Sequence, residues 1–353
     1  MDECSRCSEF PALESKGLII FYEKQPALFV QLKNLLYQKG VDVKESATLL
    51  QVSYSSFDEL TEWMRFLNEQ LSPVQKRRLY GSYSATKNEE ISFLKMTSFH
   101  ELFVRISNRQ LLQIINHRLF VPFLQPIVQL QKDEIYGYEF LLRQKSEAYP
   151  FSPGRLFAFS QQAGLQTVLD GQARIVSIEA GAKILKSGIK RFINFLPSSI
   201  YDPNHCLKST FKAAEQFRVD PKDLVFEVVE TEKIADVDHL KKIFKTYQEY
   251  GINVALDDIG SGFATLNVLQ ELRPNFAKID RKLVAHCDGD KEKQTQIKAI
   301  IDISREQGTS LLAEGIERAE EAEFCKEAGI ELAQGYYFGK PQPLPNPEDQ
   351  IAS

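Results

Sequence analysis

Hydrophobic residues in the first part of the chain have the spacing of a small α/β domain. Short apolar runs alternate with segments in which apolar residues recur every three or four positions, as on one face of a helix. The two runs that predict strands are LIIFY (18–22) and ATLLQVSY (47–54). Helices are predicted to begin at Pro26 and at Phe57, and Gly40 suits the end of the first of them.

A further helix is predicted to begin at Ser72-Pro73, and we expect it to reach about Tyr80. Helical spacing returns over about 98–118, after a polar stretch. The pattern therefore predicts a small α/β N-terminal domain over residues 1–85 and a helical connector over 86–118.

A different unit repeats from about residue 120 onward. Eight apolar runs have strand character: VPFLQPIV, YGYEFLLR, RFINFLP, LVFEVVE, NVALDDI, FAKID, SLLAEGI and LAQGYYF. Only QLQKDEI separates the first two, so we expect them to be antiparallel, whereas the later runs are spaced for one crossover helix between parallel strands. This predicts an α/β fold, a modified (β/α)8 TIM-like barrel with one antiparallel strand, over 119–345, with a tail over 346–353. The alternative is an open doubly wound sheet.

Composition narrows the classes of partner. The chain has 43 Lys and Arg against 48 Asp and Glu, a net charge of −5, so no bulk positive field favours a nucleic-acid polymer or an anionic membrane. No apolar run reaches the roughly 18 residues of a membrane helix, and the polar start is unlike a secretory signal, so we expect a cytoplasmic protein. Of five cysteines only Cys4 and Cys7 are close in sequence, and they lack a second ligand pair for zinc, so we expect free thiols there.

Polar side chains follow the predicted strands at the end where barrel enzymes carry their catalytic groups. They are Glu139, Asn194, Glu227, Asp257, Asp258, Lys278, Glu314 and Gln334. The carboxylates among them would repel one another in one mouth, and cations remove that penalty. An oxygen-rich set without sulfur suits Mg²⁺ or Mn²⁺, so the pattern favours a two-metal phosphoesterase in which Lys278 faces phosphate or the attacking water. The alternative is that Lys278 forms a Schiff base, as in barrel aldolases, but an aldolase mechanism has no role for so many carboxylates.

Eight segments, in order over about 120–345, resemble the EAL family of cyclic di-GMP phosphodiesterases. They are LQPIV, YEFLLR, FINFLPSSIY, FEVVE, ALDDIGSGFATL, AKID, AEGIE and AQGYYFGKP. The family signature Glu-Ala-Leu stands here as Glu139-Phe140-Leu141. The departures from the family motifs spare the charged residues.

The resemblance implies a role for each matching residue. Metal ligands would be Glu139, Asn194, Glu227, Asp257, Asp258 and Glu314, with Glu314 a general base as the alternative. Lys278 and Gln334 would position the nucleophilic water, and Glu230 would anchor the loop that begins at Gly260. Gln125, Leu141 and Arg143 would contact the dinucleotide, with Arg143 on a phosphate. Asp280 and Glu317 would either support these groups or only cap helices.

The resemblance further implies an activity and partners. The expected reaction is linearisation of cyclic di-GMP to pGpG in bacterial second-messenger signalling, with Mg²⁺ or Mn²⁺ bound and with inhibition by Ca²⁺, whose coordination is longer and looser. A homodimer through the barrel and a regulatory N-terminal domain are also expected. The alternative is a receptor that binds cyclic di-GMP without hydrolysing it.

Overall fold

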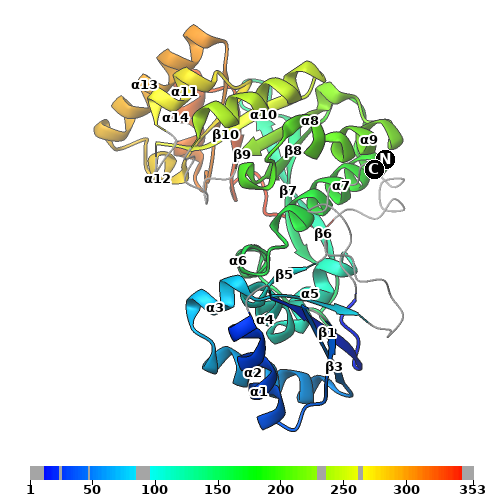
Figure 1. The fold of residues 1–353 in the computed structure, drawn as a ribbon. Coiled ribbons are helices and arrows are strands. Elements are labelled where there is room, and N and C mark those ends of the chain that lie inside the picture. The colour runs from blue at the N-terminus through cyan, green and yellow to red at the C-terminus, as the bar shows by residue number, and fades with distance from the viewer. Residues whose placement is uncertain are drawn as a thin grey trace. The chain divides into compact units, whose positions relative to one another are not determined.

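The computed structural model describes residues 12–23, 26–46, 48–84, 96–228, 236–260 and 265–343. The chain forms two compact units (Figure 1). The first comprises Met1–Phe120 with Gln144–Leu169, and the second comprises Val121–Arg143 with Asp170–Ser353. The sequence predicts domain boundaries near residues 85, 118 and 345. These describe domains that would fold separately, and they stay predictions.

The first unit is built on a five-stranded antiparallel sheet of strand order β2-β3-β1-β4-β5. Its strands are β1 (Gly17–Tyr22), β2 (Val43–Ser46), β3 (Leu49–Tyr54), β4 (Tyr80–Ser84) and β5 (Thr97–Ser98). Its helices are α1 (Pro26–Gln38), α2 (Phe57–Gln70), α3 (Pro73–Arg78), α4 (Phe99–Ser107), α5 (Arg109–Asn116) and α6 (Pro153–Gln162). The buried rings of Trp63 and Phe99 each lie 6.2 Å from that of Phe21, between centroids, and join α2 and α4 to the central strand.

The elements predicted within residues 1–118 are found, with one error and three omissions. The helix that begins at Pro73 ends at Arg78, not near Tyr80, because Tyr80 already pairs with Tyr22 in the sheet. Strand β4 has the sequence YGSYS, whose Gly and Ser residues have low strand propensity, so pairing with β1 decides its conformation. The omitted strands β2 and β5 are short strands at the two edges of the sheet.

The second unit is a closed barrel of strand order β10-β11-β12-β13-β6-β7-β8-β9. Its strands are β6 (Phe120–Gln129), β7 (Glu134–Gln144), β8 (Lys190–Phe195), β9 (Leu224–Val228), β10 (Asn253–Ile259), β11 (Phe276–Ile279), β12 (Ser310–Ala313) and β13 (Leu332–Gln334). Neighbouring strands are parallel from β7 round to β13, whereas β6 is antiparallel to β13. The prediction of a modified TIM-like barrel with one antiparallel strand is therefore confirmed.

Helices lie around the outside of the barrel strands (Figure 1). They are α7 (Gln166–Ile184), α8 (Pro203–Cys206), α9 (Lys208–Gln216), α10 (Val237–Glu249), α11 (Leu266–Leu272), α12 (Arg281–Val284), α13 (Lys291–Gln307) and α14 (Ala319–Ala328), with 3-10 turns at Pro197–Ser199 and Pro221–Asp223. Gly308 and Gly329 end α13 and α14 in the left-handed conformation, which is the C-cap role that the sequence predicts.

An apolar layer fills the inside of the barrel. It consists of Ile127, Phe192, Val225, Ala255, Phe276, Leu312 and Leu332, one from each of seven strands. Side chains alternate between the faces of a strand, so residues two positions nearer the mouth also point inward. Those residues are Gln125, Asn194, Glu227, Asp257, Lys278, Glu314 and Gln334. The apolar layer is therefore the floor of a polar site at the C-terminal ends of the parallel strands.

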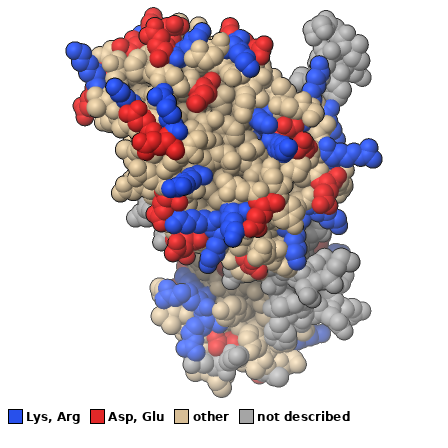
Figure 2. All heavy atoms as spheres, turned by 90° about the horizontal axis from the view of Figure 1, so that it is seen from above, with Lys and Arg blue, Asp and Glu red and all other residues tan. Residues whose placement is uncertain are grey.

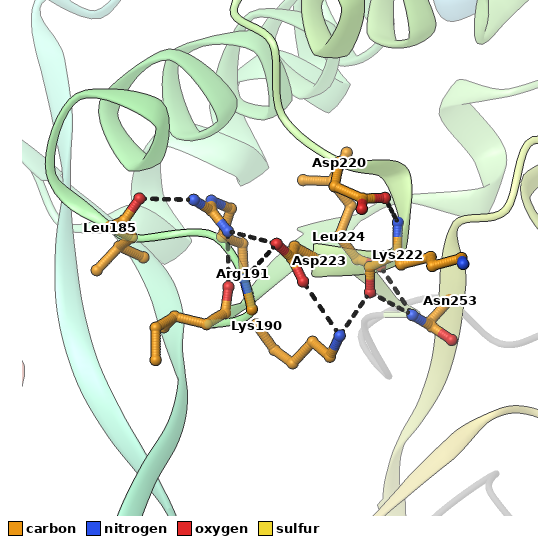
Figure 3. Close-up of polar contacts among 10 residues, drawn as sticks. Leu185, Lys190, Arg191, Asp220, Lys222, Asp223, Leu224 and Asn253 are labelled. Atoms are coloured by element: carbon orange, nitrogen blue, oxygen red, sulfur yellow. Dashed lines mark hydrogen bonds and ion pairs between the residues drawn. The ribbon is translucent and has the colours of Figure 1, made fainter.

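A separate polar cluster closes the opposite end of strands β8 and β9 (Figure 3). The buried Asp223 accepts the Gly188 N–H at 2.7 Å and the Lys190 ammonium at 3.2 Å, and Arg191 lies 3.7 Å away. Lys190 also donates to the Lys222 carbonyl at 2.9 Å. One carboxylate thus faces two cations at the bottom of the barrel.

Surface charge is mixed on the face that Figure 2 shows, where Lys and Arg alternate with Asp and Glu. This agrees with the near-balanced composition of the chain. Among the helices of the described residues, none has the length and apolar character needed to span a membrane.

The substitution Phe192→Ala tests the interior layer. Phe192 is fully buried and meets Phe276 edge to face, with ring centroids 5.3 Å apart. We expect the loss of this ring to lower the free energy of unfolding by about 3–5 kcal/mol in urea titrations. Ile135→Ala, at a side chain that is 41% exposed, is the control and should change it by less than about 0.5 kcal/mol. Equal effects of the two changes would contradict a packed floor.

Candidate active site

Lys278 lies at the centre of the barrel mouth and is 1% exposed. Its Nζ is surrounded by four carboxylates, at 2.6 Å from Glu314 Oε1, 2.7 Å from Glu227 Oε2, 3.3 Å from Asp257 Oδ1 and 3.8 Å from Glu139 Oε1. Strands β7, β9 and β10 and the end of β12 supply these groups. Residues separated by up to 175 positions in sequence therefore meet around one ammonium group, because parallel strands bring their C-terminal ends to one side.

Glu139 is oriented by two amide side chains. Asn194 Nδ2 donates to Glu139 Oε1 at 3.1 Å, and Gln334 Nε2 donates to Glu139 Oε2 at 2.7 Å. These bonds use the amide nitrogens. The Oδ1 atom of Asn194 and the Oε1 atom of Gln334 therefore remain near the same carboxylate as oxygen atoms that could ligate a metal ion. The prediction that Glu139, Asn194 and Gln334 lie together agrees with this geometry.

Asp257 and Asp258 lie at an irregularity of strand β10. Neighbouring residues of a regular strand point to opposite faces, so the pair could not share one site without a change in the backbone. The pairing of β10 with β11 shifts register between Leu256 and Ile259, and Asp258 has a left-handed φ of 56°. The Asp258 N–H donates to Asp257 Oδ1 at 2.9 Å. A bulge of this kind redirects side chains next to active sites, and here it brings carboxylate oxygens of Asp257, Asp258 and Glu314 within 4.8 Å of one another.

The loops that follow Glu314 and Gln334 are joined through their backbones. Ile316 N–H donates to the Gln334 carbonyl at 3.1 Å, and Tyr337 N–H donates to the Ile316 carbonyl at 3.0 Å. A Cβ atom on Gly335 would lie 2.0 Å from the Ile316 oxygen. Only glycine permits this close approach, so Gly335 holds the two loops at a fixed spacing. Gly335 is not among the site residues predicted from the sequence, although its position directly after a strand-end glutamine is a usable signal.

Burial and like charge disturb the ionisation of the cluster. Burial raises the pKa of Glu227 to about 8, with added repulsion from Glu139 and Asp257, although Lys278 opposes the shift. Burial also raises the pKa of Asp257 and of Glu314. Desolvation lowers the pKa of Lys278, but the surrounding carboxylates outweigh it and raise that pKa well above its ordinary value. Lys278 therefore stays charged, and the carboxylates compete for a single cation.

The donor set fits divalent cations. Glu227 Oε1 and Gln334 Oε1 are buried side-chain oxygens for which the described residues provide no hydrogen-bond partner. All candidate ligands are carboxylate or amide oxygens, which Mg²⁺ and Mn²⁺ prefer. Asp257 and Glu314 are partly open, with side chains 13% and 18% exposed, so an ion could reach the cluster from the mouth.

The remaining predicted residues fall into three groups. Gln125 lies at the mouth and donates to the Gly339 carbonyl at 3.2 Å. Leu141 and Arg143 are half-buried on β7, beyond Glu139, and the Arg143 guanidinium lies 6.0 Å from the centre of the Phe123 ring. Glu230 and the loop after Gly260 lie outside the described residues, as do Cys4 and Cys7.

Asp280 and Glu317 have roles of their own in the fold. Asp280 is the N-cap of α12, where its side chain accepts the Lys282 N–H. Glu317 is half-exposed and pairs with Arg281 at 3.3 Å. The Asp280 contact is that of a helix cap, whereas the Glu317 ion pair is not, and a supporting role of either acid at the site stays a prediction.

The fold and the site define a TIM-like barrel with one reversed strand and a carboxylate-rich mouth centred on lysine. The chain belongs to the EAL domain family, whose model matches residues 108–341. The probable cyclic di-GMP phosphodiesterase PdeG of Escherichia coli K12 is 30% identical over 233 residues, which are 64% of this chain and 45% of that protein. The match thus spans less than half of that relative.

Solved structures share the barrel. A standalone EAL protein of Vibrio cholerae O395, in its cyclic di-GMP-bound form, is 33% identical with a TM-score of 0.58, and the match covers 65% of this chain and 97% of that one. A manganese and cyclic di-GMP complex of Klebsiella pneumoniae BlrP1 is 20% identical with a TM-score of 0.58, covering 93% of this chain and 96% of that one. The second likeness concerns the fold alone.

The substitution Lys278→Met tests the charge balance of the cluster. It leaves buried carboxylates without their cation, which costs about 3–5 kcal/mol when one partner of a buried pair is removed. We expect a large drop in melting temperature in excess chelator, and we expect Mn²⁺ to narrow the gap to wild type because it can neutralise the same carboxylates.

Lys190→Met is the matched control for this measurement. Lys190 pairs with Asp223 at the other end of the barrel, so Mn²⁺ should leave its deficit unchanged. A Lys278→Met deficit that is equally large with and without Mn²⁺ would contradict a cation site at the mouth.

Proposed function

We propose that this chain is a metal-dependent phosphodiesterase that linearises cyclic di-GMP to pGpG in bacterial second-messenger signalling. The observation that carries the proposal is the cluster of Glu139, Glu227, Asp257 and Glu314 around Lys278. Membership of the EAL family and the cyclic di-GMP in the complex of the Vibrio cholerae relative support the choice of substrate.

The proposed cofactors are two Mg²⁺ or Mn²⁺ ions. Residues that would hold them are Glu139, Asn194, Glu227, Asp257, Asp258 and Glu314, with Asp257 shared between the ions. When bound, such ions polarise a phosphodiester and make an attacking water more acidic. The grouping of Asp257, Asp258 and Glu314 oxygens supports this assignment.

Protein groups would supply orientation and proton transfer. Lys278 has a fixed ammonium in the centre of the cluster and would position the water and stabilise negative charge in the transition state. Gln334, already bonded to Glu139, would orient the same water through its Oε1 atom, which has no hydrogen-bond partner among the described residues. Glu314, whose pKa burial raises, would accept the proton or ligate an ion.

Residues beyond the cluster would recognise the dinucleotide. Arg143, on the strand that carries Glu139, would bind a phosphate through its planar guanidinium. Leu141 would provide an apolar contact, and Gln125 would lie on the guanine side. Their placement on β6 and β7 supports this assignment, because both strands border the mouth.

The direct test is incubation of the purified chain with cyclic di-GMP and Mn²⁺, followed by chromatography. We expect pGpG to form with Mn²⁺ or Mg²⁺, and we expect chelation or an excess of Ca²⁺ to stop the reaction. Lys278→Ala should bind cyclic di-GMP with little loss but turn it over at least 100-fold more slowly, about 2.7 kcal/mol of barrier. Binding without any product in the wild-type chain would favour a receptor instead.

Glu230→Ala tests the proposed anchor of the loop after Gly260. Glu230 lies three positions after Glu227, and strand alternation would direct two such residues to opposite faces, so we do not expect it to ligate the same ion. Its carboxylate would instead accept N–H groups of that loop and thereby hold Asp258 in place. We expect turnover to fall at least tenfold, about 1.4 kcal/mol, and the metal requirement to rise, while the melting temperature stays near wild type. Glu232→Ala is the control. If turnover and metal requirement change equally in both variants, Glu230 does not anchor the loop.

The assembly and location of the chain belong to the same proposal. We propose a homodimer through the barrel, a regulatory N-terminal domain over residues 1–85, and action in the cytoplasm. Sedimentation at several protein concentrations would test the dimer, and a single monomeric species up to high concentration would overturn it.

A further inference from the structure

A buried ion pair lies directly behind the end of strand β8. Asp170 and Arg174, one turn apart on α7, form this pair at 3.0 Å, and each is 2% exposed. Arg174 also donates to Thr210 Oγ1 at 2.6 Å. Neither charge belongs to the lysine-centred cluster, and neither stands among the residues that the family resemblance selects.

Asp170 also accepts hydrogen bonds from the chain segment that follows Asn194. Its Oδ1 accepts the Leu196 N–H at 2.9 Å, and its Oδ2 accepts the Ser199 hydroxyl at 2.5 Å. Phe195, which lies between Asn194 and Leu196, packs edge to face on the buried Tyr247, with ring centroids 5.5 Å apart. The chain is therefore fixed immediately after Asn194.

Stability alone does not account for this arrangement. A buried ion pair adds little compared with apolar side chains of similar volume, because desolvation offsets the attraction. What the pair provides is a fixed position for the Leu196 amide, two residues beyond the side chain that bonds to Glu139. We propose that Asp170 is a positioning residue that sets Asn194 for metal binding. The proposal rests on the function proposed above.

A matched control, Asp223, lies in the turn before β9 and contacts the chain at the other end of β8. Asp223 is also buried and also accepts a backbone N–H, that of Gly188, beside two cations (Figure 3). Gly188 lies six residues before Asn194, about 20 Å along an extended chain. A general loss of barrel stability would follow from either change, whereas a loss of metal geometry would follow only from Asp170.

The experiment measures Mn²⁺ binding to the full-length, metal-free chain by calorimetry, together with melting temperature. We expect Asp170→Asn to weaken Mn²⁺ binding at least fivefold and Asp223→Asn to change it less than twofold. In an Asn194→Ala background, Asp170→Asn should weaken binding no further, because it acts through Asn194. Equal weakening of Mn²⁺ binding by Asp170→Asn and Asp223→Asn would overturn the proposal. Additive effects of Asp170→Asn and Asn194→Ala in their double variant would also overturn it.

A milder change covers the case in which Asp170→Asn does not fold. Ser199→Ala removes one hydrogen bond to Asp170 and should weaken Mn²⁺ binding at least twofold with a small change in melting temperature; unchanged binding would count against the proposal. If the wild-type chain binds no Mn²⁺, the proposed metal site fails and this inference with it. If wild type binds and both Asp170→Asn and Ser199→Ala bind equally well, only the inference fails.

Discussion

The constraint on which the site depends is the burial of one ammonium group among four carboxylates. Lys278 is held in the barrel interior, because it lies on the barrel strand β11 and its side chain is 1% exposed. Its charge makes the burial of Glu227 tolerable, yet a single cation cannot balance four carboxylates. The amides of Asn194 and Gln334 hold Glu139 in place within this cluster.

Backbone geometry helps to fix the distances between the acids of the mouth. A left-handed Asp258 directs two adjacent acids to one place, at an energetic cost of the kind that persists at functional sites. Gly335 lets the loop after β13 touch the backbone at Ile316. These contacts place oxygens by main-chain position, which varies less than the conformation of a long side chain. The apolar floor below, with Phe192 and Phe276 at its centre, keeps the strands at their spacing.

The sequence predicts the barrel well because its signal is periodic. Segments of helical spacing separate the later runs, and only a short turn separates the first two, so the parallel strands and the antiparallel first pair follow from the pattern alone. The polar layer also follows, since Glu227 and Lys278 stand two positions after interior apolar residues. Strand β4 does not, because Gly81, Ser82 and Ser84 become a strand only through their partners in the sheet.

The two ends of the barrel differ in charge, and this difference explains where a cation would bind. At the bottom, Asp223 faces Lys190 and Arg191, so the pair of cations already exceeds the acid. At the mouth, Glu139, Glu227, Asp257 and Glu314 face Lys278 as the one cation that the described residues bring to them, and Asp258 lies beside them. Because the interior screens charge poorly, the excess of acid at the mouth attracts cations there and not at the other end. The sequence already separates Asp223, which precedes its strand, from Asp257, which lies near the end of one. It could not establish that Lys190 and Arg191 neutralise Asp223, because the fold alone brings them together.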